Sequence, residues 1–395
     1  MALLLGEREN VAASRLTGRG RERKVLLMKA ICNRGALLDA LNLTGNVVAA
    51  RTPKPVLQCL KLTVEDNALT VTATDLEVAI RYRDEQVQIE QPGETLVPAD
   101  KLRDIVRECI DDTLAIEITG DTAHIRGQDS HFKIFTQKTT DFPPVPDFEG
   151  EPDVQVAGGS LKQLIGQTLF AAAKESTRYA FNGVLVVVKA KKISLISTDG
   201  RRLAMAKGDL AAGDKLDKEG KKAIVPAKAL QLIEKLIDDP EELVGIQIRE
   251  NQVVFKTASA TLTSNLVEGQ FPPYDDVIPK DADKKMSAST ADFLSAIRRA
   301  ALLTTEESRG VRLAFSKKGL ILTSRSPESG EATINFPCKF EGADIEIGFN
   351  PIFLVDALRV VNTDEVSLEM LAPNRPGLLK AGADFLYVIM PVNLQ

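Results

Sequence analysis

The segment LTVTATDL at residues 69–76 recurs 124 residues later as ISLISTDG at 193–200. In both copies a strand-like alternation leads into a Thr-Asp turn, where the aspartate can accept backbone hydrogen bonds. A third version, LILT at 320–323, leads to Ser326 and Pro327 at a further offset of 127 residues. Such spacing indicates an internal repeat that covers most of the chain.

Helical patterns stand at matching places in each copy. A longer amphipathic helix opens each copy, at 36–48, 160–173 and 290–303. A shorter one follows Val97-Pro98-Ala99, Val225-Pro226-Ala227 and Phe349-Asn350-Pro351. Each copy then closes in paired strand patterns, such as 114–118 with 123–126 and 244–248 with 253–255. The expected order is helix, strands, helix, strands, three times.

Two proline-rich turns, FPPVP at 142–146 and FPPY at 271–274, interrupt this order. They predict an α+β chain of three similar domains, at 28–150, 151–280 and 281–395. Two helices on several antiparallel strands cannot bury every apolar face within one unit, so the copies must pack side by side. Three units related by a constant rotation either spiral openly or close into a ring with three units from a second chain.

Residues 1–27 stand apart from the repeat. They hold six basic and three acidic residues, a local charge of +3, without a periodic apolar face. The apolar run Leu3-Leu4-Leu5 precedes the arginines, which is the wrong order for a signal peptide. We interpret the segment as a disordered extension or the product of an upstream start codon. The alternative is a basic arm that touches nucleic acid.

The amino-acid composition limits which classes of function the chain can have. The 395 residues are 44% hydrophobic and 27% charged, with a mean hydropathy of -0.06 and no apolar run long enough for a membrane span. Four cysteines without a C-x-x-C pair indicate a reducing cytoplasm and no zinc cluster. His124 and His131 are the two histidines, so histidine-based catalysis and metal binding are improbable. We expect no catalytic residue, metal or cofactor.

Seven motifs carry a resemblance to a known family. They are VPA at 97–99, RYAFNG at 178–183, TDGRRLA at 198–204, FPPY at 271–274, RGVRL at 309–313, IGFN at 347–350 and YVIMP at 387–391. In this order and spacing they make residues 28–395 resemble the bacterial sliding clamps, the beta subunits of DNA polymerase III. The resemblance implies the DNA clamp fold, a head-to-tail homodimeric ring whose helices line a central hole and whose antiparallel sheets lie outside.

The same resemblance implies a processivity factor without chemistry of its own. Double-stranded DNA passes through the hole without sequence recognition. The implied partners are the DNA polymerase III alpha subunit, an ATP-dependent clamp loader, and other polymerases and repair proteins that carry short clamp-binding motifs.

The charge distribution agrees with a helix-lined hole. The net charge is -5, which leaves -8 on residues 28–395. The six expected helical segments carry +5 and the rest of 28–395 carries -13. Lysines and arginines on helices would attract phosphates weakly enough to slide, while an acidic exterior discourages binding outside the hole. The alternative is that these helix-surface cations are merely solvated.

Site residues follow from the resemblance, motif by motif. The positions that approach DNA are Arg51, Lys174, Arg178 and Tyr179, for which plain solvent exposure is the alternative. The positions that line an apolar peptide cleft between domains 2 and 3 are Phe181, Thr198, Gly200, Arg202, Leu203, Pro272, Val277, Val388, Met390, Pro391 and Val392. Dimer contacts are implied for Phe132, Leu302 and Leu303. Without the resemblance, Leu203, Val388 and Met390 would be read as ordinary core residues.

Two departures from the family pattern bear on partner preference. Asp275 and Asp276 stand where many relatives have basic residues, and Phe181 stands where an aliphatic residue is common.

Two other classes of function stay open at this point. One is an enzyme, such as a hydrolase that uses Asp75 or Asp199, although no second carboxylate or histidine is placed beside either by motif. For Asp199, a turn in which the carboxylate accepts backbone hydrogen bonds is a sufficient explanation. The other is a closed repeat scaffold that binds only peptides.

Overall fold

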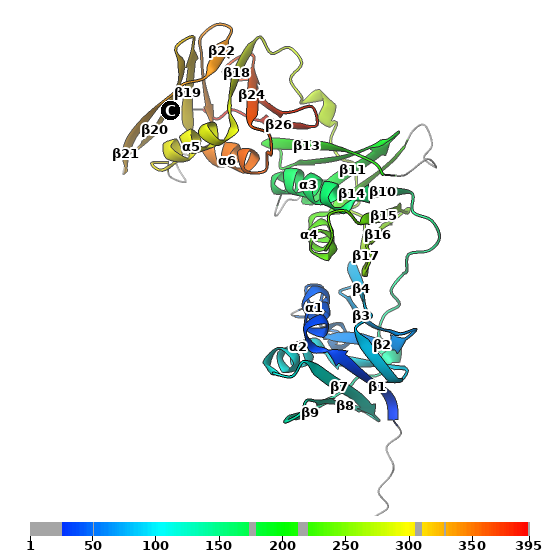
Figure 1. The fold of residues 1–395 in the computed structure, drawn as a ribbon. Coiled ribbons are helices and arrows are strands. Elements are labelled where there is room, and N and C mark those ends of the chain that lie inside the picture. The colour runs from blue at the N-terminus through cyan, green and yellow to red at the C-terminus, as the bar shows by residue number, and fades with distance from the viewer. Residues whose placement is uncertain are drawn as a thin grey trace, which may run out of the picture.

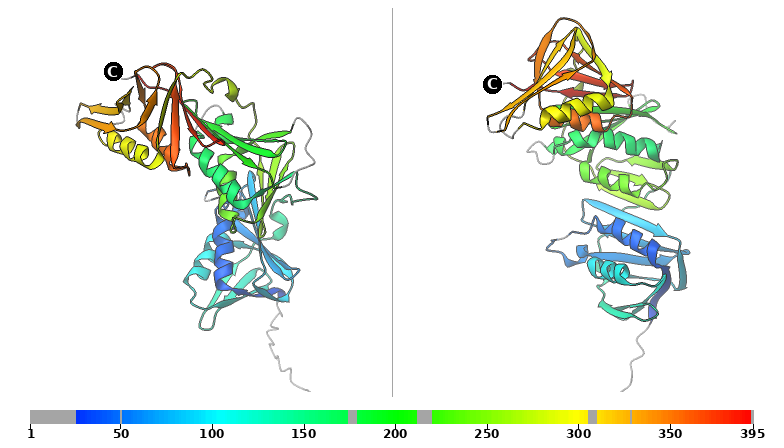
Figure 2. Two further views of the ribbon diagram at one scale, coloured as in Figure 1. Left: turned by 45° about the horizontal axis from the view of Figure 1, so that its top comes forward. Right: turned by 60° about the vertical axis from the view of Figure 1, so that its left-hand side comes forward.

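Three domains follow one another along an arc, with the helices on its concave side and the sheets on its convex side (Figures 1 and 2). The computed structural model describes residues 26–49, 51–173, 179–211, 220–304, 310–327 and 329–393. Within these ranges each domain contributes two α-helices and two groups of antiparallel strands. This arrangement confirms the expected α+β class of three similar units.

Domain 1 begins with a strand that leads directly into its first helix. Asn33 caps that helix by accepting a hydrogen bond from the Ala36 backbone N–H at 3.0 Å. Its elements are β1 (Leu26–Asn33), α1 (Arg34–Gly45), η1 (Pro55–Gln58), β2 (Cys59–Glu65), β3 (Ala68–Thr74), β4 (Val78–Asp84), β5 (Val87–Gln91), β6 (Gly93–Pro98), α2 (Ala99–Glu108), β7 (Thr113–Thr119), β8 (Thr122–Arg126), β9 (His131–Phe135) and η2 (Thr139–Asp141).

Domain 2 repeats this order. Its elements are β10 (Val154–Ala157), α3 (Gly158–Thr168), η3 (Leu169–Ala171), η4 (Tyr179–Asn182), β11 (Gly183–Lys189), β12 (Lys192–Thr198), β13 (Arg202–Asp209), β14 (Lys221–Pro226), α4 (Ala227–Leu236), β15 (Leu243–Ile248), β16 (Gln252–Lys256), β17 (Ala260–Asn265) and η5 (Tyr274–Asp276).

Domain 3 repeats the order again, and side chains cap both of its helices. Ser289 accepts from the Asp292 N–H, and Asn350 accepts from the Ile352 N–H next to a proline in the first turn. Its elements are β18 (Lys284–Ser289), α5 (Thr290–Ala301), β19 (Val311–Ser316), β20 (Gly319–Ser326), β21 (Gly330–Phe336), β22 (Lys339–Glu341), β23 (Ile345–Phe349), α6 (Pro351–Arg359), β24 (Glu365–Met370), β25 (Gly377–Ala381) and β26 (Phe385–Ile389).

The opening element of each unit differs from the sequence expectation. A strand (β1, β10 or β18) precedes the longer helix in every domain. These strands run into the helices without an intervening turn, and in domain 2 Gly158 and Gly159 are themselves the first residues of α3. The longer helices also end at Gly45, Thr168 and Ala301, a few residues before the expected ends. In addition, β1 starts at Leu26, two residues inside the segment set apart as 1–27.

Two of the four sheets cross domain boundaries. The eight-stranded sheet has the order β10-β15-β16-β17-β4-β3-β2-β6, and the nine-stranded sheet β14-β11-β12-β13-β26-β25-β24-β18-β22. Antiparallel pairing of β17 with β4 joins domains 1 and 2, and pairing of β13 with β26 joins domains 2 and 3. The five-stranded sheet β5-β1-β7-β8-β9 lies within domain 1, and the four-stranded sheet β21-β20-β19-β23 within domain 3.

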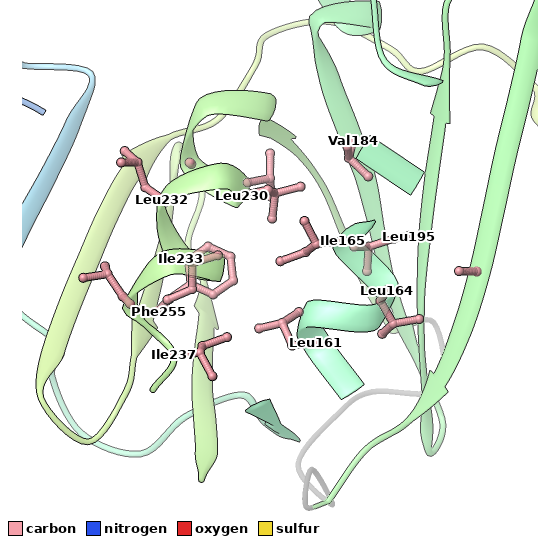
Figure 3. Close-up of a cluster of buried hydrophobic side chains, with 14 of the residues drawn as sticks. Leu161, Leu164, Ile165, Val184, Leu195, Leu230, Leu232, Ile233, Ile237 and Phe255 are labelled. Carbon is pink, nitrogen blue, oxygen red and sulfur yellow. The ribbon is translucent and has the colours of Figure 1, made fainter. Parts of the chain in front are cut away.

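The helices pack on these sheets through one apolar stripe each. In domain 2, Leu161, Leu164 and Ile165 of α3 have spacings of three and four residues and are at most 2% exposed. Leu161 and Ile165 face Leu230 and Ile233 of α4 across the domain core, whereas Leu164 points toward the strands near Leu195 (Figure 3). Since burying a leucine or isoleucine side chain stabilises the fold by about 1.5–3 kcal/mol, this stripe fixes the helix on its sheet.

Candidate functional site

The Thr-Asp turn between β12 and β13 is built by its own side chains. Asp199 Oδ1 accepts hydrogen bonds from the backbone N–H groups of Arg201 and Arg202, at 2.9 and 3.0 Å. Thr198 Oγ1 donates to the Arg202 carbonyl and accepts from the Gly200 N–H, and Gly200 has a φ of 85°. The carboxylate therefore organises the backbone, which confirms the structural explanation given for Asp199.

An apolar cluster lies beside this turn, on the outer face of the nine-stranded sheet. Leu203 of β13 lies opposite Val388 of β26, and both are nearly inaccessible. The cluster contains Leu185, Ile196, Leu203, Met205, Ile224, Leu378 and Val388. The segment between domains 2 and 3 packs on it through Phe271, Tyr274 and Ile278. Domains 2 and 3 thus share one apolar patch at their junction.

The end of the chain lies against the turn. The Met390 N–H donates to the Arg201 carbonyl at 3.0 Å, and the Val392 N–H donates to the Gly348 carbonyl at 2.9 Å. Met390 remains 43% exposed. A β-carbon placed on Gly200 would lie 3.6 Å from the ring of Phe181, which is 8% exposed. The structure therefore brings Phe181, Gly200, Leu203, Val388 and Met390 to one place, which we call the C-terminal apolar surface.

The remaining expected peptide contacts lie around this surface or behind it. Val277 follows η5 and is 49% exposed, and Pro272 is adjacent to the packed Phe271. Pro391 and Val392 continue the chain from Met390 and are partly exposed. Arg202 differs from the rest, because it points to the opposite side of the sheet.

Arg202 is a buried cation at the junction of domains 2 and 3. Its side chain is 11% exposed. Nε donates to Asp199 Oδ2 at 3.1 Å, Nη1 to Asp356 Oδ2 at 2.7 Å and Nη2 to the Phe170 carbonyl at 2.9 Å. The guanidinium carbon also lies 4.4 Å from the centre of the Phe353 ring. These contacts link β13 and η3 in domain 2 to α6 in domain 3.

The expected DNA contacts are only partly within the described residues. Arg51 lies in the segment after α1 and is exposed. Lys174 and Arg178 fall outside the described ranges, and of Tyr179 only the backbone, at the start of η4, is described.

The expected dimer contacts lie at the two ends of the arc. Leu302, directly after α5, is 79% exposed, Leu303 is partly exposed, and Phe132 on β9 is 37% exposed. Sequence reasoning missed Phe135 at the end of β9, which is 79% exposed. A large apolar residue on an edge strand without a neighbouring strand is the signal that could have found it.

The two histidines form one unit on the domain 1 end of the arc. His124 Nδ1 and His131 Nε2 are 3.0 Å apart, and the rings are stacked with centroids 5.2 Å apart. Thr119 Oγ1 lies 2.9 Å from His124 Nε2. Desolvation, together with Arg126 and Lys133, lowers the pKa of both rings.

Neither a metal-binding cluster nor a membrane-spanning helix is found in the part of the chain that the structure describes. In those ranges no three His, Cys, Asp or Glu side chains are grouped so that they could hold a metal ion. No helix of the described ranges is both long and apolar enough to cross a membrane.

Comparison with known proteins covers nearly the whole repeat. Models of the DNA polymerase III beta subunit match residues 28–146 as its N-terminal domain, 155–273 as its central domain and 275–393 as its C-terminal domain. The beta sliding clamp of Vibrio cholerae is 34% identical over 373 residues, which are 93% of this chain and 100% of that protein.

Solved structures show the same likeness. The DNA polymerase III subunit beta of Pseudomonas aeruginosa superimposes with a TM-score of 0.86 at 34% identity, over 93% of this chain and 100% of that one. The DNA polymerase sliding clamp of Bacillus subtilis superimposes with a TM-score of 0.89 at 28% identity and the same coverage.

Proposed function

The chain belongs to the DNA polymerase III beta subunit family, and on that premise we propose that it is a processivity factor that closes as a homodimeric ring around duplex DNA. In this role it tethers the replicative polymerase to its template. The observation that carries the proposal is the position of β9 and β21: among the described strands each is an edge of its sheet, and they stand at the two ends of a three-domain arc.

The internal repeat indicates how these edges would pair. In domain 1 the strand β4, and in domain 2 the equivalent strand β13, each pair with the last strand of the following domain, β17 or β26. In domain 3 the equivalent strand is β21, and the last strand of domain 1 is β9. We propose that β21 of one chain pairs with β9 of a second copy. Two such head-to-tail junctions close six domains into a ring in which β9 and β21 are no longer edge strands.

The repeat also predicts the register of this pairing. Ala204 of β13 lies opposite Tyr387 of β26. Ala332 holds the place of Ala204 in β21, since each lies opposite the equivalent serine of the preceding strand. Phe132 holds the place of Tyr387 in β9. Ala332 is therefore expected opposite Phe132 of the second copy, and Glu331 opposite its Lys133, an opposite-charge pair.

The leucines after α5 fit the same junction. Phe170 lies five residues after Ile165 of α3, and Leu302 lies five residues after Ile297 of α5. Phe170 packs against Tyr387 across the junction of domains 2 and 3, with ring centroids 5.8 Å apart. By the repeat, Leu302 would pack against Phe132 of the second copy. This supports Phe132, Leu302 and Leu303 as dimer contacts.

The mass in solution tests the ring directly. A homodimer has a mass of about 86 kDa, twice the 42.9 kDa of the chain. A stable monomer at micromolar concentration contradicts the proposal.

Duplex DNA would pass along the concave side, where the helices lie (Figure 1). We propose that Arg51, Lys174, Arg178 and Tyr179 approach its phosphates. Phosphate contacts without base contacts position a protein on DNA without sequence preference. Because residues 28–395 carry a net charge of -8, affinity for free duplex should be weak and fall steeply with salt.

Partner proteins would dock on the C-terminal apolar surface and its surroundings. We propose Phe181, Thr198, Gly200, Arg202, Leu203, Pro272, Val277, Val388, Met390, Pro391 and Val392 as the residues that form this peptide site. Met390 and Val277, which are 43% and 49% exposed, offer apolar contacts to an extended peptide. The resemblance to the family implies a peptide with a glutamine followed by leucine and phenylalanine. A flexible methionine lets one surface accept several partners: the polymerase alpha subunit, the clamp loader and repair proteins.

We further propose that the chain has no chemistry or cofactor of its own and works in the cytoplasm. The Asp199 carboxylate, which a hydrolase would need free, is occupied by two backbone N–H groups and by Arg202. ATP hydrolysis then belongs to a separate loader. Turnover of phosphoesters by the purified protein with Mg²⁺ or Mn²⁺, abolished by Asp199→Asn, contradicts this part of the proposal.

A further inference from the structure

We infer that Arg202 acts on the peptide site as a positioning residue: it couples the C-terminal apolar surface to the junction of domains 2 and 3 and does not itself contact the partner peptide. The inference rests on the proposed peptide site and assigns one of its residues a different role.

Each nitrogen of the Arg202 guanidinium already donates a hydrogen bond within the chain. Nε, Nη1 and Nη2 each bond to an acceptor from a different segment: the turn at Asp199, helix α6 at Asp356 and η3 at Phe170. The guanidinium also lies between the rings of Phe353 and Phe170, at 4.4 and 5.4 Å from their centres. A peptide would therefore meet a cation that is only 11% exposed and already bonded through every nitrogen.

Strand geometry also separates Arg202 from the peptide site. Successive side chains of a strand point to opposite faces of the sheet. Leu203 belongs to the cluster on the outer face, and its strand partner Val388 belongs to it too. Arg202 therefore faces the helix side, where α6 and η3 lie.

The turn transmits the position of Arg202 to the peptide site. Asp199 binds Arg202 through Oδ2 and two backbone N–H groups through Oδ1. That turn holds Gly200 near the Phe181 ring and presents the Arg201 carbonyl to the Met390 N–H. Loss of the bond between Arg202 and Asp356 would remove the side-chain link between the turn and α6 of domain 3, while the pairing of β13 with β26 remains.

The junction of domains 1 and 2 has a similar arrangement. In domain 1, Asp75 Oδ1 accepts from the backbone N–H groups of Glu77 and Val78, as Asp199 does in domain 2. Its Oδ2 binds Lys228 on α4 of the following domain. In both junctions the turn aspartate is thus linked to the second helix of the next domain, directly through Lys228 or through Arg202 to Asp356. This recurrence indicates a device for fixing the turn relative to its neighbour.

Asp356→Asn separates positioning from direct contact, because this carboxylate lies on α6 and points away from the C-terminal apolar surface. The assay is the affinity of a fluorescent peptide that contains the Gln-Leu-Phe motif for the full-length protein. Positioning predicts that Asp356→Asn and Arg202→Met each weaken binding about tenfold, within the usual range for coupled sites. Arg202→Lys, which keeps the charge without the planar fork, should recover part of the loss.

Two further variants complete the design. Asp292→Asn makes the same change at an exposed position of α5 and should leave the affinity unaltered. Arg202→Met combined with Asp356→Leu replaces Arg202, 11% exposed, and its partner Asp356, 28% exposed, by apolar residues, an exchange that often leaves stability unchanged or higher. Asp199, the other partner of Arg202, keeps its two backbone hydrogen bonds. The double variant should still bind peptide weakly, although its melting temperature is close to that of the native protein.

The outcomes separate a failure of the positioning role of Arg202 from a failure of the proposed peptide site. Weak binding by Arg202→Met with native affinity for Asp356→Asn means that Arg202 contacts the peptide, and it overturns the inference. Native affinity of the double variant means that Arg202 serves the fold alone, and it also overturns the inference. If the native protein does not bind the peptide at all, the proposed peptide site fails first, and the inference fails with it.

Discussion

Replacing Leu302 and Leu303 with alanine should convert the ring to a monomer. Leu302 is 79% exposed in the isolated chain, so nearly its whole side chain is available for burial at the junction. Losing it costs about 2 kcal/mol, and the partly covered Leu303 adds about 1 kcal/mol, for a total near 3 kcal/mol per junction.

The ring doubles this effect. A head-to-tail dimer contains two identical junctions, so complete dissociation loses about 6 kcal/mol and opening of one junction loses about 3 kcal/mol. At about 1.4 kcal/mol for each factor of ten, the dissociation constant should rise about 10⁴-fold, and one junction should open about 100-fold more readily.

Mass photometry and sedimentation across a concentration series measure both species. Leu243→Ala is the matched control, because Leu243 is also exposed, at 50%, but starts β15 of domain 2. The melting temperature of the double variant establishes that the protomer is folded. A dissociation constant within threefold of the native value, or an equal shift from Leu243→Ala, would refute the placement of the interface.

Three other predictions follow from the same structure. Removing Met390–Gln395 should weaken peptide binding by about 2 kcal/mol, a loss typical of interface hot spots, without changing the dimer mass; equal affinity for both forms, measured by titration, would place the peptide site elsewhere. Deleting residues 1–25 should leave the melting temperature, the dimer mass and DNA retention unchanged, since the segment has no periodic apolar face; a large drop in any of them would give the basic arm a role. The lowered pKa of His124 and His131 means that the unfolded chain binds more protons below about pH 6.5, so this contribution to stability is present above that pH and is lost on acidification. His131→Asn should therefore reduce the fall in melting temperature between pH 7 and pH 5, and an unchanged profile would contradict it.

Local chemistry explains which parts of the structure could be predicted from the sequence. The Thr-Asp turn is encoded within five residues, so its hydrogen bonds at Asp199 were predictable. The starts of α2, α4 and α6 coincide with the Pro-Ala and Asn-Pro steps that mark them. The opening strands were missed because they run into a helix cap without a break.

The features that could not be predicted depend on pairing between strands that are far apart in the sequence. That β13 would pair with β26, across 175 or more residues, depends on how two domains meet and leaves no mark in the sequence. The placement of Arg202 follows from the same pairing, because its partner Asp356 lies 154 residues away. A motif match identified the residue, but only the fold shows which side of the sheet it faces.

Retention on DNA circles tests the central claim most directly. The protein is loaded by a clamp loader and ATP onto a nicked circular duplex and then challenged with high salt, which screens phosphate contacts. If the chain forms a closed ring that is linked to DNA topologically, it should stay on the circle and leave as soon as a restriction enzyme makes the DNA linear. Protein that remains bound to the linear product at high salt, or that leaves the intact circle equally fast, would contradict the account.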